Sequence, residues 1–177
     1  MVDFKRTLNG ALAGGVAAAT WAAQQPADKR AFASGYDDVE LLGKAVTRGE
    51  AWPAAGLALH VANGAAFGAT YSALRPFLPG PLVGRALTMA LIEHVALWPL
   101  GRFVDSHHPA RKELTTLTGN GRAFAQATWR HLLFGLVLGE LERRLNPEGE
   151  DEPPEIPVSS NGHGNIELAV GAGSDAS

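Results

Sequence analysis

The chain contains four apolar segments whose lengths match the thickness of a lipid bilayer. They cover residues 8–24, 52–74, 82–104 and 123–141, and are 17, 23, 23 and 19 residues long. About 20 consecutive apolar residues form a helix long enough to cross the hydrocarbon core of a bilayer. Helix-breaking prolines and glycines separate the segments. The sequence therefore predicts an all-α protein whose fold is a four-helix transmembrane bundle.

Prolines predict how the segments end and connect. Pro26 follows the first segment, and the turn of residues 75–81 between the second and third contains three prolines. Because this turn is short, the second and third helices are expected to be antiparallel neighbours. Pro99 lies inside the third segment and is expected to kink or end that helix, since proline has no amide hydrogen to donate.

Two further regions complete the predicted organisation. Asp37, with Glu40 three positions later, resembles a helix N-cap and predicts a short helix over residues 37–48, either lying on lipid headgroups or packed on the bundle as a connector. Residues 146–177 hold seven acids and no Lys or Arg, and their composition predicts a disordered acidic tail. We therefore expect a membrane domain over residues 1–145, followed by this tail.

Charge and composition limit the classes of partner. The domain before the tail has 15 bases against 11 acids, a net charge of +4, which suits an anionic lipid surface and is too small to indicate nucleic acid. The chain has no cysteine, so thiolate chemistry and disulfides are excluded. No nucleotide-binding loop or nucleophile elbow is present. Arg exceeds Lys by 11 to 4, and Ala and Gly are abundant, as in proteins from GC-rich bacteria.

Small residues repeat at four-residue spacing along the apolar segments. In lipid, helices associate through close van der Waals approach, which glycines at this spacing permit. Each of three glycine pairs is expected to mark a helix contact: Gly10 and Gly14, Gly64 and Gly68, Gly135 and Gly139. In the third segment, the row Ala86, Ala90, His94 and Trp98 is expected to face protein, and the row Val83, Leu87, Leu91 and Val95 to face lipid.

Polar residues lie near the middle of three apolar segments, where charge is costly unless it faces protein or trapped water. Counting from the segment midpoints predicts one buried polar layer: His60, Asn63, Glu93, His94, Arg130 and His131. One interpretation is a structural clasp in which Glu93 pairs with Arg130. Another is a proton or ion pathway that uses Glu93 and a histidine. A third is a haem ligated by His60 and His131.

A metal site is the weakest of these interpretations. It would join Glu93 and His94 to His107 and His108, but the last two lack the i, i+4 spacing that places ligands on one helical face. The spacing of these residues therefore indicates no metal, no cofactor and no catalytic residue.

Two alternatives for the whole chain stay open. Lys5 and Arg6 followed by the run 8–19 could form a cleaved secretory signal, which would leave three spans. A soluble helical bundle is the other alternative, because central charges oppose membrane insertion. It would need a polar face along each segment, and residues 61–69 and 132–139 have almost none. The counts of Lys and Arg on the two sides do not fix the orientation in the membrane, but Lys5 and Arg6, directly before the first segment, favour termini on the cytoplasmic side.

The small-residue run from Gly64 to Gly68, and His131 with Phe134, Gly135 and Gly139, resemble the small four-span bacterial inner-membrane proteins of the YagU type. The resemblance covers about a third of the chain and implies an integral inner-membrane protein without an established activity. We expect a non-enzymatic structural or partner-binding protein, whose partners are the lipid bilayer and either a second copy of itself or another membrane protein.

Overall fold

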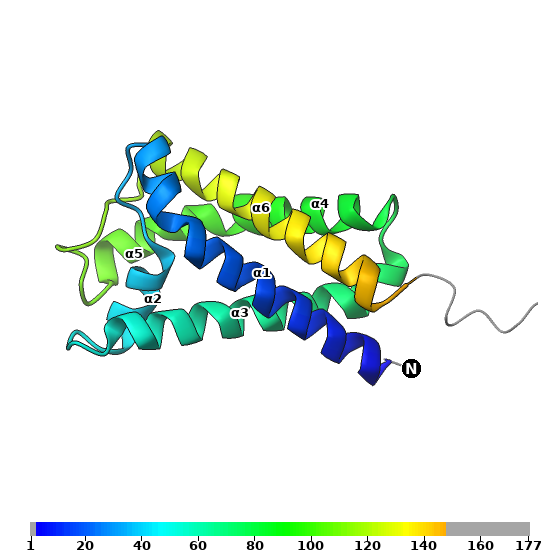
Figure 1. The fold of residues 1–177 in the computed structure, drawn as a ribbon. Coiled ribbons are helices and arrows are strands. Elements are labelled where there is room, and N and C mark those ends of the chain that lie inside the picture. Colours follow the sequence, from blue (N-terminus) through cyan, green and yellow to red (C-terminus); the bar gives the residue numbers. More distant parts are fainter. Residues whose placement is uncertain (1–2, 148–177) are drawn as a thin grey trace, which may run out of the picture. The chain divides into compact units, whose positions relative to one another are not determined.

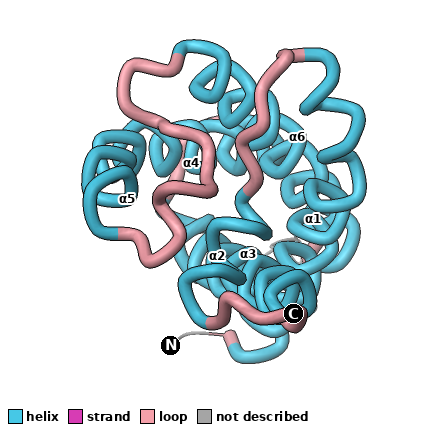
Figure 2. Tube along the Cα trace, turned by 90° about the vertical axis from the view of Figure 1, so that its left-hand side faces the viewer, coloured by secondary structure: helices cyan, strands magenta, loops and turns pink. Residues whose placement is uncertain are grey.

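The computed structural model describes residues 3–147, and within them it contains helices and loops only (Figures 1 and 2). Four long helices run back and forth between two ends of the molecule. The helices are α1 (Phe4–Ala31), α2 (Asp38–Val46), α3 (Trp52–Leu74), α4 (Leu82–Leu97), α5 (Gly101–His107) and α6 (Gly121–Leu145), with short 3-10 turns η1 (Arg75–Phe77) and η2 (Trp98–Leu100). The predicted all-α class is confirmed. The predicted tail lies outside the described residues, except for Asn146 and Pro147.

Helix ends follow the local chemistry at most positions. The side chain of Asp37 accepts a hydrogen bond from the Glu40 amide at 2.9 Å, as expected for the N-cap of α2. The α4 helix ends at Leu97, directly before the turn that contains Pro99, so the expected break is confirmed. The end of α1 was wrongly predicted: the helix continues through Pro26 to Ala31 instead of stopping at residue 24.

The long helices are arranged in the order α3, α1, α6, α4. The α1 helix crosses diagonally between α3 and α6, and α4 packs on the far side of α6 (Figure 1). The α3 and α4 helices are antiparallel and joined by η1, but they do not pack along their length, so the expectation that they are close neighbours is wrong. The α1 and α6 helices lie between them, and a space is left between α3 and α4.

All six glycines of the predicted stripes lie where two helices meet. A Cβ atom added to Gly14 would lie 2.0 Å from the Gly64 carbonyl oxygen, and one added to Gly68 would lie 2.1 Å from the Gly10 carbonyl oxygen. Such distances are shorter than any non-bonded contact, so only glycine fits the crossing of α1 and α3.

The crossing of α6 and α4 depends on the third glycine pair, Gly135 and Gly139. Cβ atoms on Gly135 and Gly139 would lie 2.8 Å from the Cα atoms of Leu87 and Val83. Val83 and Leu87 therefore face protein, so the expectation that their row faces lipid is wrong for these two residues, whereas Val95 of the same row is 61% exposed, as expected. The most exposed side of α4 is displaced to Ile92 and Val95, because the partner glycines draw Val83 and Leu87 inward. Ala86, Ala90 and His94 are buried, as expected for the row that packs on protein.

The short α2 helix packs on α3 as a connector between α1 and α3. A Cβ atom on Gly43 would lie 2.1 Å from the Trp52 carbonyl oxygen, so the two helices touch through their backbones. This contact favours the connector interpretation of residues 37–48. Together α2 and α5 cover one end of the long helices; Figure 2 looks along the helices from this end.

Within residues 3–147, one helical stretch is long and apolar enough to cross a membrane: Leu82–His107, which includes α4, η2 and α5. By this criterion the four-span prediction is supported for one span only. Ala and Gly make up much of α1 and α3, and α6 begins and ends with charged residues, so the hydropathy of these helices is low.

Candidate functional site

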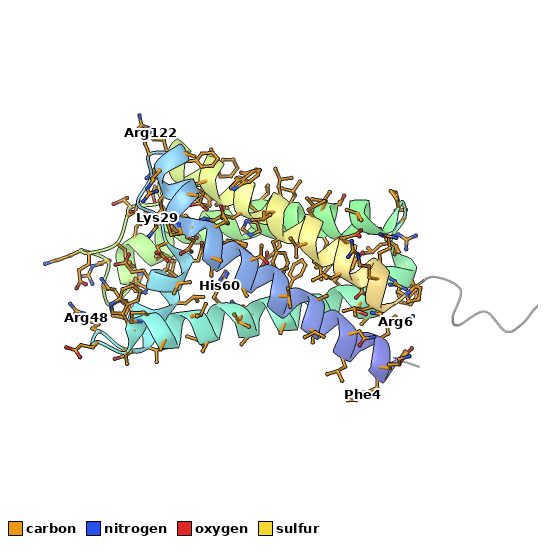
Figure 3. The ribbon with its side chains drawn as sticks, in the orientation of Figure 1. Phe4, Arg6, Lys29, Arg48, His60 and Arg122 are labelled. Atoms are coloured by element: carbon orange, nitrogen blue, oxygen red, sulfur yellow. The ribbon has the colours of Figure 1, made fainter. Side chains whose placement is uncertain are left out.

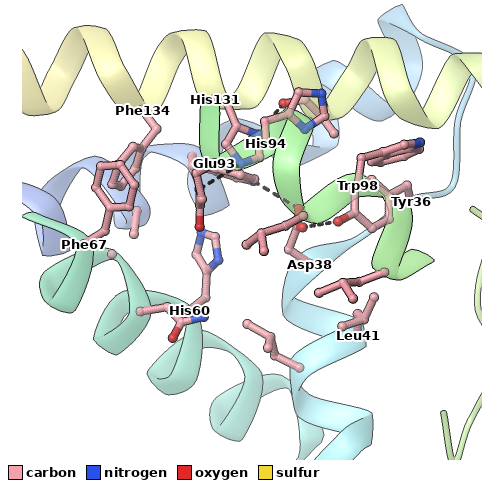
Figure 4. Close-up of a pocket in the computed structure, with 18 of the residues that line it drawn as sticks. Tyr36, Asp38, Leu41, His60, Phe67, Glu93, His94, Trp98, His131 and Phe134 are labelled. Atoms are coloured by element: carbon pink, nitrogen blue, oxygen red, sulfur yellow. Dashed lines mark hydrogen bonds and ion pairs between the residues drawn. The ribbon is translucent and has the colours of Figure 1, made fainter. Parts of the chain in front are cut away.

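A cavity of about 680 Å³ lies between α3 and α4. It exists because these helices diverge while α1 and α6 form its floor, with Trp21 and Phe134 among the residues that line it there. Leu41 and Leu42 of α2 also line the cavity, and Figure 4 shows Leu41 on this helix. The size is in the range that accommodates small organic ligands, and most of the wall is apolar or aromatic.

The cavity collects five of the six residues of the predicted polar layer. His60 and Asn63 come from α3, Glu93 and His94 from α4, and His131 from α6. Counting from segment midpoints placed these residues at one depth, and the divergence of α3 and α4 gives them a shared space. The sixth residue, Arg130, does not line the cavity.

Arg130 instead pairs with Asp28 and Asp38, two acids that lie outside the four apolar segments. Its guanidinium donates to Asp28 at 2.6 and 2.7 Å and to Asp38 at 2.6 Å, and also to the Tyr36 carbonyl oxygen. The Arg130 side chain is 0% exposed and that of Asp28 is 1% exposed. The expected Glu93–Arg130 clasp is therefore wrong: the clasp connects α6 to α1 and α2, and leaves Glu93 to the cavity.

Asp38 is the centre of this buried network. Its carboxylate accepts hydrogen bonds from Arg130, from the Tyr36 hydroxyl and from the Trp21 indole nitrogen at 3.2 Å. Burial, together with the adjacent Asp38 carboxylate, raises the pKa of the Tyr36 hydroxyl well above its ordinary value. Tyr36 therefore stays a protonated donor, and the Asp38 charge is satisfied before any ligand enters.

Glu93 of α4 pairs with His131 on the neighbouring helix α6. Its carboxylate lies 3.4 Å from Nε2 of His131, whose Nδ1 lies 2.7 Å from the Ala127 carbonyl oxygen. The His94 ring packs on the His131 ring with centroids 4.6 Å apart, and His94 Nε2 lies 3.0 Å from the Thr128 hydroxyl. The Glu93 side chain is 41% exposed, which makes it an accessible carboxylate in the cavity.

His60 contributes a nitrogen that has no partner. The residue is 7% exposed, and its Nε2 atom is buried without a hydrogen bond to any described residue. Figure 4 shows the Glu93 side chain extending from α4 toward the His60 ring on α3. A buried polar atom without a partner costs free energy, so it needs an explanation.

The haem and metal interpretations find little support in this geometry. The Trp21 indole packs edge-on against both His60 and His131, with ring centroids 5.1 and 4.8 Å apart, so a porphyrin between these histidines would have to displace it. Within residues 3–147, no three His, Asp or Glu side chains are placed to hold a metal ion. His108 contacts the Leu41 carbonyl oxygen and the Ala110 amide instead, and belongs to the loop structure.

Comparison with known proteins adds no relative: no protein family, no characterised protein and no solved structure matches this chain.

Proposed function

We propose that this chain is an integral protein of the bacterial inner membrane, that α1, α3, α4 and α6 each span the bilayer, and that it binds a small, largely apolar molecule in the cavity between α3 and α4. Its role is non-enzymatic. The observation that carries the binding function is the cavity itself, which combines an apolar wall with a few convergent polar groups.

The distribution of side chains supports a membrane location. Large apolar side chains are exposed along all four long helices, among them Leu12, Leu59, Ile92 and Leu136, whereas Arg130 is fully buried. Residues 8–23, 53–74 and 123–139 carry no exposed charge. Figure 3 shows Lys29, Arg48 and Arg122 at one end of the helices and Arg6 at the other. In a soluble bundle the apolar side chains are buried and the charged ones exposed, so this distribution is the reverse and is expected for helices surrounded by lipid.

The position of the cavity indicates where its ligand comes from. Because α3 and α4 do not pack on each other, the cavity between them is bordered by two helices with apolar outer faces. A ligand dissolved in the bilayer would enter between these two helices.

Filling the cavity tests the proposal. We expect Ala66→Trp, which adds a large side chain to the cavity wall, to abolish binding of the neutral probe N-phenyl-1-naphthylamine. Ala58→Trp is the matched control, since Ala58 is an exposed alanine on the same helix and does not line the cavity. Equilibrium dialysis against protein in lipid nanodiscs, with empty nanodiscs as the blank, measures both. Equal binding by the two variants would exclude the cavity as the binding site.

Proton-linked transport is a second candidate, favoured by the Glu93–His131 pair in the cavity. If this function holds, Glu93→Gln should abolish proton-coupled flux of the ligand in proteoliposomes, because glutamine cannot exchange a proton. Flux that persists in this variant would reject Glu93 as the proton carrier.

A further inference from the structure

We propose that the ligand of this cavity is a lipophilic primary amine in its ammonium form, with Glu93 as its counter-ion and Nε2 of His60 as an acceptor for one of its N–H groups. This inference names the ligand class of the binding function proposed above and depends on it.

The charge balance of the cavity calls for a cation. Among the described residues that line it, the acids are Asp38 and Glu93, and there is no Lys or Arg. Asp38 already has Arg130 as an ion-pair partner, whereas Glu93 has only His131 beside it. Arg130 itself is shared between two carboxylates, Asp28 and Asp38, so it leaves no positive charge in excess. A ligand cation would supply the charge that Glu93 lacks.

The hydrogen-bonding groups call for N–H donors. A carboxylate only accepts hydrogen bonds, and a neutral imidazole offers one acceptor nitrogen. His60 lines the cavity, and its Nε2 atom is buried and has no partner among the described residues. An ammonium group between His60 and Glu93 would donate to both, whereas a quaternary ammonium ion would satisfy the charge alone.

The rest of the cavity fits the apolar part of such a ligand. Phe67, Trp98 and Phe134 line it, together with leucines of α2 and α4. Aromatic faces also attract cations, most strongly where water is excluded. An aryl or alkyl chain would therefore lie along the aromatic wall, while its ammonium group reaches Glu93.

Three naphthyl probes of similar shape test the inference: 2-(1-naphthyl)ethylammonium, 2-(1-naphthyl)ethanol and 3-(1-naphthyl)propionate. Equilibrium dialysis uses the full-length protein in phosphatidylcholine nanodiscs, whose lipid has no net charge. We expect the ammonium probe to bind about 10- to 100-fold tighter than the alcohol, the range for a hydrogen bond to a charged group, and the propionate to bind weakest.

Glu93→Gln should remove the preference for the ammonium probe, so that this variant binds the ammonium and the alcohol about equally. Glu140→Gln is the matched control, since Glu140 lies on α6 outside the cavity and pairs with Arg143 and Arg144. An unchanged preference in Glu93→Gln would overturn the inference. If wild-type protein binds the alcohol as tightly as the ammonium, the inference also fails, but the proposed binding function stands. If the wild-type protein binds none of the probes, including N-phenyl-1-naphthylamine, both the inference and the proposed binding function are refuted.

The contribution of His60 has its own test. His60→Leu should weaken binding of the ammonium probe more than binding of the N,N,N-trimethyl form of the same probe, because that form has no N–H to donate. Circular dichroism of the variant checks that the helices remain folded. An equal loss for both probes would contradict a hydrogen bond at Nε2 and assign His60 a role in packing against Trp21.

Discussion

Replacing Arg130 with alanine is expected to lower the free energy of unfolding by about 3–5 kcal/mol, the cost of leaving buried carboxylates without their counter-ion. Two acids depend on this guanidinium: Asp28, with a side chain 1% exposed, and Asp38, at 15%. The α1 and α2 helices would lose their shared attachment to α6. Titration with denaturing detergent, followed by circular dichroism, measures the effect.

Arg143→Ala is the matched control for Arg130→Ala. Arg143 lies on the same helix and also forms an ion pair, but its side chain is 54% exposed. Surface pairs contribute about 0–1 kcal/mol, so this variant should unfold close to the wild-type midpoint. Equal losses of stability in the two variants would show that Arg130 is not in a buried network.

A double-mutant cycle identifies the partner of Arg130. The effects of Arg130→Ala and Asp28→Ala should be far from additive, because either change alone breaks the same contact. The effects of Arg130→Ala and Glu93→Ala should add to within about 0.5 kcal/mol, as they do for residues without shared partners. Coupling between Glu93 and Arg130 instead would restore the clasp expected from the sequence alone.

The wrongly predicted partner of Arg130 shows that local sequence patterns do not encode tertiary contacts. Pro26 was interpreted as the end of the first helix, which placed Asp28 in a loop and out of consideration as a partner. Proline removes one backbone hydrogen bond, and tertiary contacts such as the Asp28–Arg130 pair can compensate for that loss. No local pattern favoured Asp28 over Glu93, because Glu93 lies at the same predicted depth as Arg130 and was the nearer candidate by counting.

Local patterns predicted elements well and the space between them poorly. The boundaries 52–74 of α3 and the break before Pro99 follow from the length of the apolar run and from proline chemistry. The cavity depends on the helix order α3, α1, α6, α4, which no local pattern encodes. The shared depth of His60, Glu93 and His131 was predictable by counting residues, but their common exposure to one cavity required the divergence of α3 and α4.

Two adjacent glycines of α1 should respond oppositely to the same substitution. A Cβ atom on Gly14 would lie 2.0 Å from the Gly64 carbonyl oxygen, so Gly14→Ala must push α1 away from α3 and cost about 1–3 kcal/mol or more. A Cβ atom on Gly15 would meet nothing closer than Val61 Cγ1 at 3.7 Å, an ordinary contact.

Gly15→Ala should therefore be neutral or stabilise the protein by up to about 1 kcal/mol, because alanine favours the helix over glycine. The same detergent titration measures both variants, and each serves as the control for the other, since the two changes add the same methyl group one residue apart. If α1 and α3 were not in backbone contact at Gly14, both substitutions would be tolerated equally. Equal tolerance would show that α1 and α3 do not cross at these glycines. The position of α3 away from α4, on which the cavity depends, would then have no explanation.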